Sequence, residues 1–227
     1  MSETPPISDD SAKNYPVPSV RRLPLYLRLL RQFSEQGRRH VSCTHIAERL
    51  GLGTVQVRKD LAMTRIVGRP KIGYQLPELI DAIESFLGWK EATGAILVGV
   101  GSLGSAILGY QDFKSHGLNI VAALDADPSK IGQRIHGHEV LPIDRIAQIV
   151  EETGSAVGIV TVPAIAAQQV THQLVQAGIL AIWNFSPVTL EVPEQIILEN
   201  VRFVDSLAVL SQRLHQQRIV DADEGNN

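Results

Sequence analysis

Residues 95–108 read AILVGVGSLGSAIL, and this stretch decides the fold of the larger part of the chain. Its first four residues predict a buried strand, and Gly99, Gly101 and Gly104 follow in the spacing G-x-G-x-x-G before an apolar helix begins. In that pattern the first glycine permits a tight turn, the second lets the backbone approach a pyrophosphate, and the third lets the helix pack closely. The stretch therefore predicts a dinucleotide-binding turn. The alternative is a glycine-rich turn that binds no ligand.

An acidic residue follows at the position that this kind of turn requires. Asp125 ends the apolar stretch NIVAALD (119–125), 21 residues after Gly104. An acid there accepts hydrogen bonds from the adenosine ribose hydroxyls and repels a 2′-phosphate. The residue therefore predicts a preference for NAD(H) over NADP(H).

Further apolar stretches alternate with helical patterns along the rest of the chain. AVGIVTV (156–162) and ILAIWNF (179–185) predict strands, and residues 145–152 and 164–177 predict helices. Strands that alternate with helices indicate a parallel, doubly wound sheet of the Rossmann type.

The N-terminal part differs in charge. The chain as a whole carries −3, but residues 13–71 hold 13 Lys and Arg against three acidic residues. Such an asymmetry favours a nucleic-acid-binding end joined to another domain. The alternative is an ordinary solvated basic surface.

Residues 41–62, VSCTHIAERLGLGTVQVRKDLA, have the pattern of a helix-turn-helix. Ser42 is a candidate N-cap of the first helix, Gly51 ends that helix, and Thr54 is a candidate N-cap of the second. The stretch VGRPKIGY (67–74) then predicts a short basic hairpin, or wing. The side chains expected to reach DNA are Thr54, Gln56, Arg58, Lys59, Arg69 and Lys71. A three-helix module for protein contacts is the alternative.

Several classes of protein are disfavoured. Cys43 is the only cysteine, which excludes an intrachain disulfide and fits a reducing cytoplasm. The first residues lack the apolar core of a secretory signal, and we expect no membrane-spanning segment. His136 and His138 lack partners at metal-ligand spacing, so we expect a solvated loop and no metal site. No catalytic motif accompanies the dinucleotide turn, which favours sensing over catalysis.

Taken in order, these motifs resemble the Rex family of redox-sensing transcriptional repressors over residues 20–215. The resemblance is carried by VRKDL, GVGSLGSA, LDADPSKIG, TVPAIAAQ, NFSPVTLEVP and LENV. It implies a cytoplasmic homodimer that binds inverted-repeat operators in double-stranded DNA. It also implies that NADH releases the DNA, that NAD⁺ competes without releasing it, and that a C-terminal helix near 207–215 is swapped between subunits.

The resemblance assigns roles residue by residue. Arg58 and Lys59 match the recognition helix, and Tyr110 matches a tyrosine near the nicotinamide across the dimer. Arg28 matches an arginine that pairs with an aspartate directly after E-N-V, but Arg202 occupies that position here. Met63, Thr64 and Arg65 also depart from the family pattern before the wing. The expected cofactor contacts are Gly99, Val100, Gly101, Ser102, Leu103, Gly104, Asp125, Thr161, Val162, Pro163, Asn184, Phe185 and Tyr110.

These patterns predict one domain organisation and one function, and they leave one alternative function. We expect a repressor that senses the NADH/NAD⁺ ratio, and the alternative is an NAD-dependent dehydrogenase with a small accessory domain. The expected domains are a flexible tail at 1–19, a winged-helix DNA-binding domain at 20–88, a Rossmann-type NAD(H)-binding domain at 89–205, and a swapped helix with its tail at 206–227.

Overall fold

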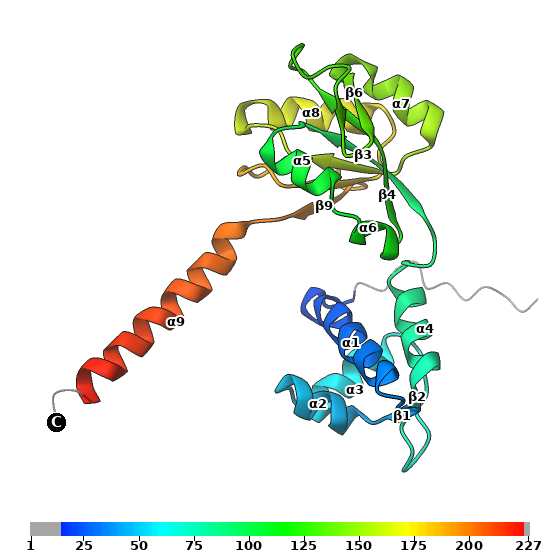
Figure 1. The fold of residues 1–227 in the computed structure, drawn as a ribbon, viewed down its shortest axis with the longest axis vertical. Helices are drawn as coiled ribbons and strands as arrows, with labels where there is room; N and C mark the ends of the chain where they lie inside the picture. The colour runs from blue at the N-terminus through cyan, green and yellow to red at the C-terminus, as the bar shows by residue number, and fades with distance from the viewer. Residues whose placement is uncertain (1–14, 225–227) are drawn as a thin grey trace, which may run out of the picture. The chain divides into compact units, whose positions relative to one another are not determined.

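The computed structural model describes residues 15–224, which fall into two compact units that divide between Lys90 and Glu91 (Figure 1). The expected tail over 1–19 lies, for residues 1–14, outside the described residues. Its last three residues belong to the first helix, which begins at Val17 with Pro18 in its first turn, a position that proline tolerates. None of the helices in the described part of the chain combines the length and the apolar character needed to cross a bilayer.

The N-terminal unit is a small helical domain with a two-stranded sheet. Its core is made by apolar side chains of α1, α2, α3 and α4, among them the fully buried Leu30, Ile46, Leu61 and Ile83. The elements are α1 (Val17–Glu35), β1 (His40–Val41), α2 (Cys43–Leu50), α3 (Thr54–Ala62), β2 (Tyr74–Gln75) and α4 (Leu76–Phe86).

Helices α2 and α3 form the predicted helix-turn-helix. The Ser42 side chain accepts a hydrogen bond from the His45 amide, and Gly51 ends α2 in a left-handed conformation at φ 64°. The N-cap of α3 is Gly53, one residue before the expected Thr54, and it makes no side-chain cap hydrogen bond. Thr54 instead occupies the first helical position, because Gly53 adopts the extended backbone required just before the helix.

The predicted wing is a short hairpin. The backbones of Arg69 and Gly73 exchange two hydrogen bonds of 2.7 and 2.9 Å, and Lys71 at the tip has φ 64°. At the base of the wing, β2 pairs antiparallel with β1. A Cβ on Gly73 would lie 2.3 Å from the Val41 carbonyl oxygen, so only glycine fits where the wing meets β1.

The C-terminal unit is a seven-stranded sheet in the order β5-β6-β4-β3-β7-β8-β9. Six of its strands run parallel, and β5 alone pairs antiparallel, with β6. The parallel strands follow the order 3-2-1-4-5-6 of dinucleotide-binding folds, with β3 as the first strand. The elements are β3 (Thr93–Val98), α5 (Ser102–Leu108), α6 (Asp112–Ser115), β4 (Leu118–Asp125), β5 (Arg134–Ile135), β6 (His138–Pro142), η1 (Ile143–Arg145), α7 (Ile146–Thr153), β7 (Val157–Val160), α8 (Ala164–Gln176), β8 (Ala181–Asn184), β9 (Ile197–Asn200) and α9 (Phe203–Glu224).

Alternate residues of the central strands point to opposite faces of this sheet. Ile96 and Val98 pack with side chains of α7 and α8, whereas Ala95 and Leu97 pack with side chains of α5. Helices therefore cover both faces, as the alternating pattern predicted (Figure 1). The short elements β5, β9 and α6 were not identified from the sequence.

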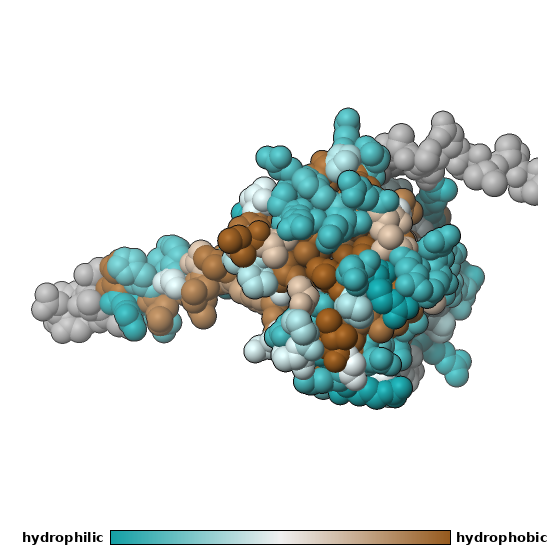
Figure 2. Space-filling model, turned by 90° about the horizontal axis from the view of Figure 1, so that it is seen from above, coloured by the Kyte–Doolittle hydropathy of each residue, from teal (hydrophilic) through white to brown (hydrophobic). Residues whose placement is uncertain are grey.

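The last helix, α9, carries large apolar side chains that are exposed. It begins at Phe203, before the expected boundary at 206, and every side chain described on it is exposed. Large apolar residues recur along it, and brown side chains interrupt the teal surface of α9 in Figure 2. The exposed apolar residues are Phe203, Val204, Leu207, Val209, Leu210, Leu214 and Ile219.

Candidate nucleotide and nucleic-acid sites

The glycine turn after β3 is fixed by packing at its first and third glycines. Gly99 has φ 101°, and a Cβ there would lie 2.8 Å from a methyl of Val162. A Cβ on Gly104 would lie 1.9 Å from the Gly99 carbonyl oxygen. These two positions admit no side chain. At Gly99 the loop after β7 lies too close, and at Gly104 the start of α5 lies directly against the end of β3.

Gly101 is different, since a Cβ there would meet no atom within 4 Å. It is the N-cap of α5, and no side chain caps that end of the helix. The first amides of α5 therefore lack helical partners. The turn thus has two glycines required by packing and one that leaves open space beside unpaired N–H groups, which is the arrangement a pyrophosphate needs.

Asp125 lies at the end of β4, close to this turn. Its carboxylate accepts hydrogen bonds from the Val100 amide (2.7 Å), the Asp127 amide (2.9 Å) and the Lys130 ammonium (3.0 Å). Burial alone raises the pKa of Asp125, but the Asp127 amide, Lys130 and the Val100 amide outweigh burial and hold the pKa below its usual value. The group is therefore a carboxylate at neutral pH, tied directly to the glycine turn.

The loops that follow β7 and β8 lie at the carboxyl ends of their strands, on the same side of the sheet as the glycine turn. After β7, the Thr161 hydroxyl donates to the carbonyls of Val98 and Gly99, at 3.0 and 2.7 Å. After β8, the Ser186 hydroxyl donates to the Val162 carbonyl at 2.6 Å. The structure thus brings the predicted residues Thr161 and Val162 against the glycine turn.

Asn184 is almost fully buried, and its side chain holds the loop after β8. Its amide nitrogen donates to the Val188 carbonyl (2.9 Å) and to Asn200 Oδ1 (2.8 Å), while its oxygen accepts from the Ser186 amide (2.9 Å). Asn184 is therefore engaged in shaping the loop, and Phe185 is the residue of this pair that borders a cavity. That cavity of about 330 Å³ is lined by Phe185, Pro187, Val188, Thr189, Val201, Arg202, Phe203 and Val204.

A row of aromatic rings connects this loop to Tyr110. The ring centroids of Phe185 and Trp183 are 4.9 Å apart, those of Trp183 and Phe113 are 5.3 Å apart, and those of Phe113 and Tyr110 are 4.8 Å apart. Tyr110 is 54% exposed at the end of the row. The row was not apparent from the sequence, because its members come from α6, β8 and two loops.

The residues expected to contact DNA lie on the surface of the N-terminal unit. Gln56, Arg58 and Lys59 are exposed on α3, and Arg69 and Lys71 are exposed on the wing. Thr54 is half-buried at the start of α3.

Asp60, a buried acid on the same helix, was not identified from the sequence. It is 2% exposed and forms a bidentate ion pair with Arg22 of α1. The sequence pattern could have predicted this ion pair. Val57, Asp60 and Leu61 share the apolar face of α3, and an acid on that face needs a buried partner.

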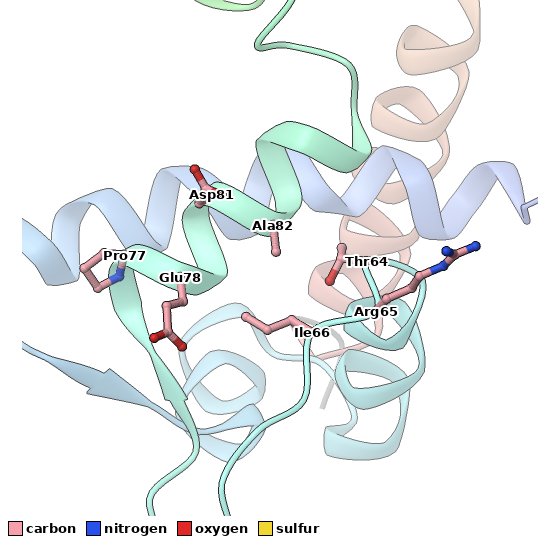
Figure 3. A pocket seen from close by; sticks show the side chains of 7 residues that line it. All are labelled: Thr64, Arg65, Ile66, Pro77, Glu78, Asp81 and Ala82. Carbon is pink, nitrogen blue, oxygen red and sulfur yellow. The ribbon is translucent and has the colours of Figure 1, made fainter. Parts of the chain in front are cut away.

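The loop that departs from the family pattern borders an open groove of about 490 Å³ in the N-terminal unit. Figure 3 shows Ile66 reaching under α4 toward Glu78, whereas Arg65 points outward, away from α4. Arg65 has a positive φ of 61°. The groove is lined by Thr64, Arg65, Ile66, Pro77, Glu78, Asp81 and Ala82.

The two remaining candidate features are His136-Gly-His138 and the arginine pair. His136 and Gly137 have positive φ and form the two-residue turn between β5 and β6. Among residues 15–224, no cluster of three His, Cys, Asp or Glu side chains could hold a metal ion. Arg28 is exposed on α1, and Arg202 donates to the Thr189 hydroxyl at 3.2 Å. Arg28 and Arg202 lie in different units, so a role for them as a pair stays a prediction.

Comparison with known proteins agrees with this architecture. Residues 90–188 match the family described as "CoA binding domain", and residues 14–62 match that described as "Putative DNA-binding protein N-terminus". The redox-sensing transcriptional repressor Rex of Treponema denticola is 44% identical over 201 residues, which cover 88% of this chain and 96% of that protein. The Rex of Bacteroides thetaiotaomicron is 38% identical over 219 residues, covering 96% of this chain and all of that protein.

Solved structures of RSP, a Rex-family repressor, are 32% identical to this chain. RSP in complex with beta-NAD⁺ and operator DNA matches with a TM-score of 0.85, covering 94% of this chain and 98% of that one. RSP in complex with beta-NADH matches with a TM-score of 0.83, covering 92% and 99%. These relatives are transcription regulators, so the dehydrogenase alternative is not supported. The winged helix, the dinucleotide-type sheet and these likenesses together show that the chain belongs to the Rex family of redox-sensing transcriptional repressors.

Proposed function

We propose that this chain is a DNA-binding repressor that senses the NADH/NAD⁺ ratio and releases its operator when NADH binds. The observation that carries the proposal is the turn after β3. Packing excludes a side chain at Gly99 and at Gly104, whereas the space beside Gly101 is unfilled. Such a turn suits a pyrophosphate, and the same chain carries a basic winged helix.

In this proposal the pyrophosphate binds across the turn from Gly99 to Gly104, and Asp125 accepts from the adenosine ribose. The loops containing Thr161, Val162 and Pro163, and Asn184 and Phe185, form the nicotinamide end. NAD and CoA share an adenosine diphosphate, but CoA carries an additional phosphate on its ribose. A carboxylate at Asp125 disfavours that phosphate, and the solved relatives hold NAD⁺ or NADH, so we favour NAD(H).

The DNA contacts come from α3 and the wing. Arg58 and Lys59 supply phosphate contacts from α3, Thr54 and Gln56 lie at its start, and Arg69 and Lys71 act from the wing. One such module reads one half-site, so an inverted-repeat operator needs two copies of the chain. A regulator that binds chromosomal DNA and an NAD(H) pool is expected in the cytoplasm.

We propose that α9 supplies the homodimer contact by exchange between subunits. Its exposed apolar side chains, such as Leu207 and Leu210, are a surface that monomeric proteins rarely leave uncovered. The double change Leu207→Asp and Leu210→Asp should convert the dimer to a monomer in light scattering after gel filtration. A dimer that survives both changes contradicts this assignment.

The proposed switch follows from linkage. NADH can release DNA only by as much as it prefers the state that does not bind DNA, and a coupling of about 1–3 kcal/mol changes affinity about 5- to 150-fold. We propose that Tyr110 reaches the nicotinamide bound to the partner subunit. Within its own subunit, the row of aromatic rings connects Tyr110 to the loop that contains Phe185. Arg202 borders the cavity beside Phe185, so Arg28 and Arg202 are proposed to influence the dimer state.

The test is fluorescence anisotropy of a labelled inverted-repeat duplex at fixed salt. The protein is titrated to saturation, and NADH, NAD⁺, NADPH or CoA is then added. Release by NADH alone supports the proposal. Release by CoA at lower concentration than by NADH contradicts the assigned ligand, and DNA that stays bound at saturating NADH contradicts the switch.

A further inference from the structure

Arg22 joins two helices of the N-terminal unit through a buried acid. Its Nε and Nη2 donate to the two carboxylate oxygens of Asp60 at 2.7 and 2.8 Å, and Nη2 also lies 3.0 Å from the Ser19 hydroxyl. The Tyr26 hydroxyl donates to Asp60 Oδ2 at 2.7 Å. Because a bidentate arginine–carboxylate pair fixes the plane of the guanidinium, Arg22 has one orientation relative to α3.

The ion pair is retained at neutral pH. Burial alone raises the pKa of Asp60, but hydrogen bonds from Arg22 and Tyr26 outweigh it and lower that pKa. The Arg22 side chain is 21% exposed, whereas that of Asp60 is 2% exposed. The guanidinium therefore extends from the buried carboxylate toward the surface of α3.

The part of Arg22 that faces the surface meets Gln56, one helical turn before Asp60. A guanidinium has only donors, so the amide oxygen of Gln56 is the atom that faces it. With the amide assigned in this orientation, Nη1 and Nη2 of Arg22 donate to that oxygen at 3.2 and 3.3 Å. Gln56 is exposed on α3, and the group that Arg22 does not occupy is its amide NH₂.

We propose that Arg22 is a specificity-determining positioning residue, which makes Gln56 a donor-only reader of the major groove. The inference rests on the proposed DNA binding by α3. A glutamine with a free amide reads adenine, because it donates to N7 and accepts from the N6 amino group. With its oxygen held by Arg22, Gln56 offers donors alone. Guanine, with acceptors at both N7 and O6, matches such a group, whereas the N6 amino group of adenine opposes it.

The consequence is a guanine preference at the base pair that Gln56 contacts, together with discrimination against adenine. A good bidentate contact discriminates by about 5- to 150-fold in affinity. The preference depends on a residue of α1 that itself makes no base contact. Its loss should therefore change which base is preferred, and not merely weaken binding to every sequence.

The experiment begins by selecting bound duplexes from a randomised pool with the full-length protein. Every base pair of one half-site of the enriched sequence is then replaced in turn, and affinities are measured by anisotropy. The position at which Gln56→Ala removes discrimination identifies the contacted base pair. At that position the unchanged protein should prefer guanine over adenine.

The decisive variant combines Arg22→Met with Asp60→Asn, so that no unpaired charge is buried. It frees the Gln56 amide oxygen, and the preference should move from guanine toward adenine. Asp60→Asn alone keeps Arg22 beside Gln56 and should keep the guanine preference. Arg21→Met, the matched control, removes a neighbouring positive charge of α1 and should also leave the preference unchanged. Thermal unfolding of each variant reports whether the fold is retained.

Gln56→Glu is a second, independent variant, because a carboxylate still accepts from Arg22 and the buried Arg22–Asp60 ion pair stays in place. It has no donor for the base, so the guanine preference should disappear while the melting temperature is unchanged. Adenine as the base preferred by the unchanged protein contradicts the inference. So does a guanine preference that survives either Gln56→Glu or the Arg22/Asp60 double change. A pool that yields no enriched sequence contradicts the proposed DNA binding itself.

Discussion

The glycine turn after β3 gives the sharpest prediction, because one methyl group has opposite consequences at two positions. At Gly101 an added Cβ meets no atom within 4 Å, and the backbone has φ −82°, which alanine adopts freely. Gly101→Ala should therefore leave the C-terminal unit as stable as before, or stabilise it by about 0.4–1 kcal/mol through the unfolded state. That gain corresponds to a melting temperature raised by about 1–4 °C.

The same methyl group fills the space where the pyrophosphate must approach. Loss of one hydrogen bond to a charged group costs about 1.5–3 kcal/mol, so NADH should bind about 10- to 150-fold more weakly. Calorimetric titration with NADH, together with thermal unfolding without ligand, measures both quantities. Gly104→Ala is the matched comparison: its Cβ would lie 1.9 Å from the Gly99 oxygen, and it should cost about 1–3 kcal/mol of stability or more.

The two variants thus separate binding from folding. If Gly101→Ala binds NADH within twofold of the unchanged protein, the turn does not hold the pyrophosphate and the reasoning fails. If Gly104→Ala is as stable as the unchanged protein, the close approach of α5 to β3 is not what requires glycine there.

Three further predictions address the DNA surface, the buried acid and the choice of cofactor. Arg58→Ala should weaken DNA binding and reduce the slope of log affinity against log salt by about 0.9 for each phosphate that the variant no longer neutralises, and an unchanged slope contradicts the assignment. Because pairing lowers the pKa of Asp60 below its ordinary value of 3.8, its stabilising contribution is present above about pH 4 and is lost as the pH falls through the folded-state pKa. Asp60→Ala should lower the free energy of unfolding by about 3 kcal/mol at neutral pH, because it leaves Arg22 without its carboxylate. The variant should also lose less stability than the unchanged protein when the pH is lowered below about 4. Asp125→Ser should lower the ratio of NADH affinity to NADPH affinity, because it removes the carboxylate that repels a 2′-phosphate and leaves Lys130 to pair with that phosphate. An unchanged ratio of the two dissociation constants would show that Asp125 does not set the choice of cofactor.

Local sequence signals predicted the main elements of both units. The Ser42 cap and Gly51 bounded α2, and the G-x-G-x-x-G spacing placed the turn between β3 and α5. These features depend on residues close together in the chain, so their periodicity and turn chemistry can be read directly. β9 was missed because its stretch, Ile197–Asn200, is short and half-exposed and lacks the apolar run of the central strands.

The sequence alone determined the fold class, the glycine turn and the acid at Asp125, because each follows from a local pattern with a known physical cause. Only the tertiary structure decided that Arg22 contacts both Asp60 and Gln56, which lie 38 and 34 positions away in the chain. It likewise decided that Asn184 is engaged in holding its loop while Phe185 borders a cavity. Hydrogen-bond partners that are distant in sequence are set by how α1 packs on α3 and how strand ends meet, and no local pattern encodes that packing.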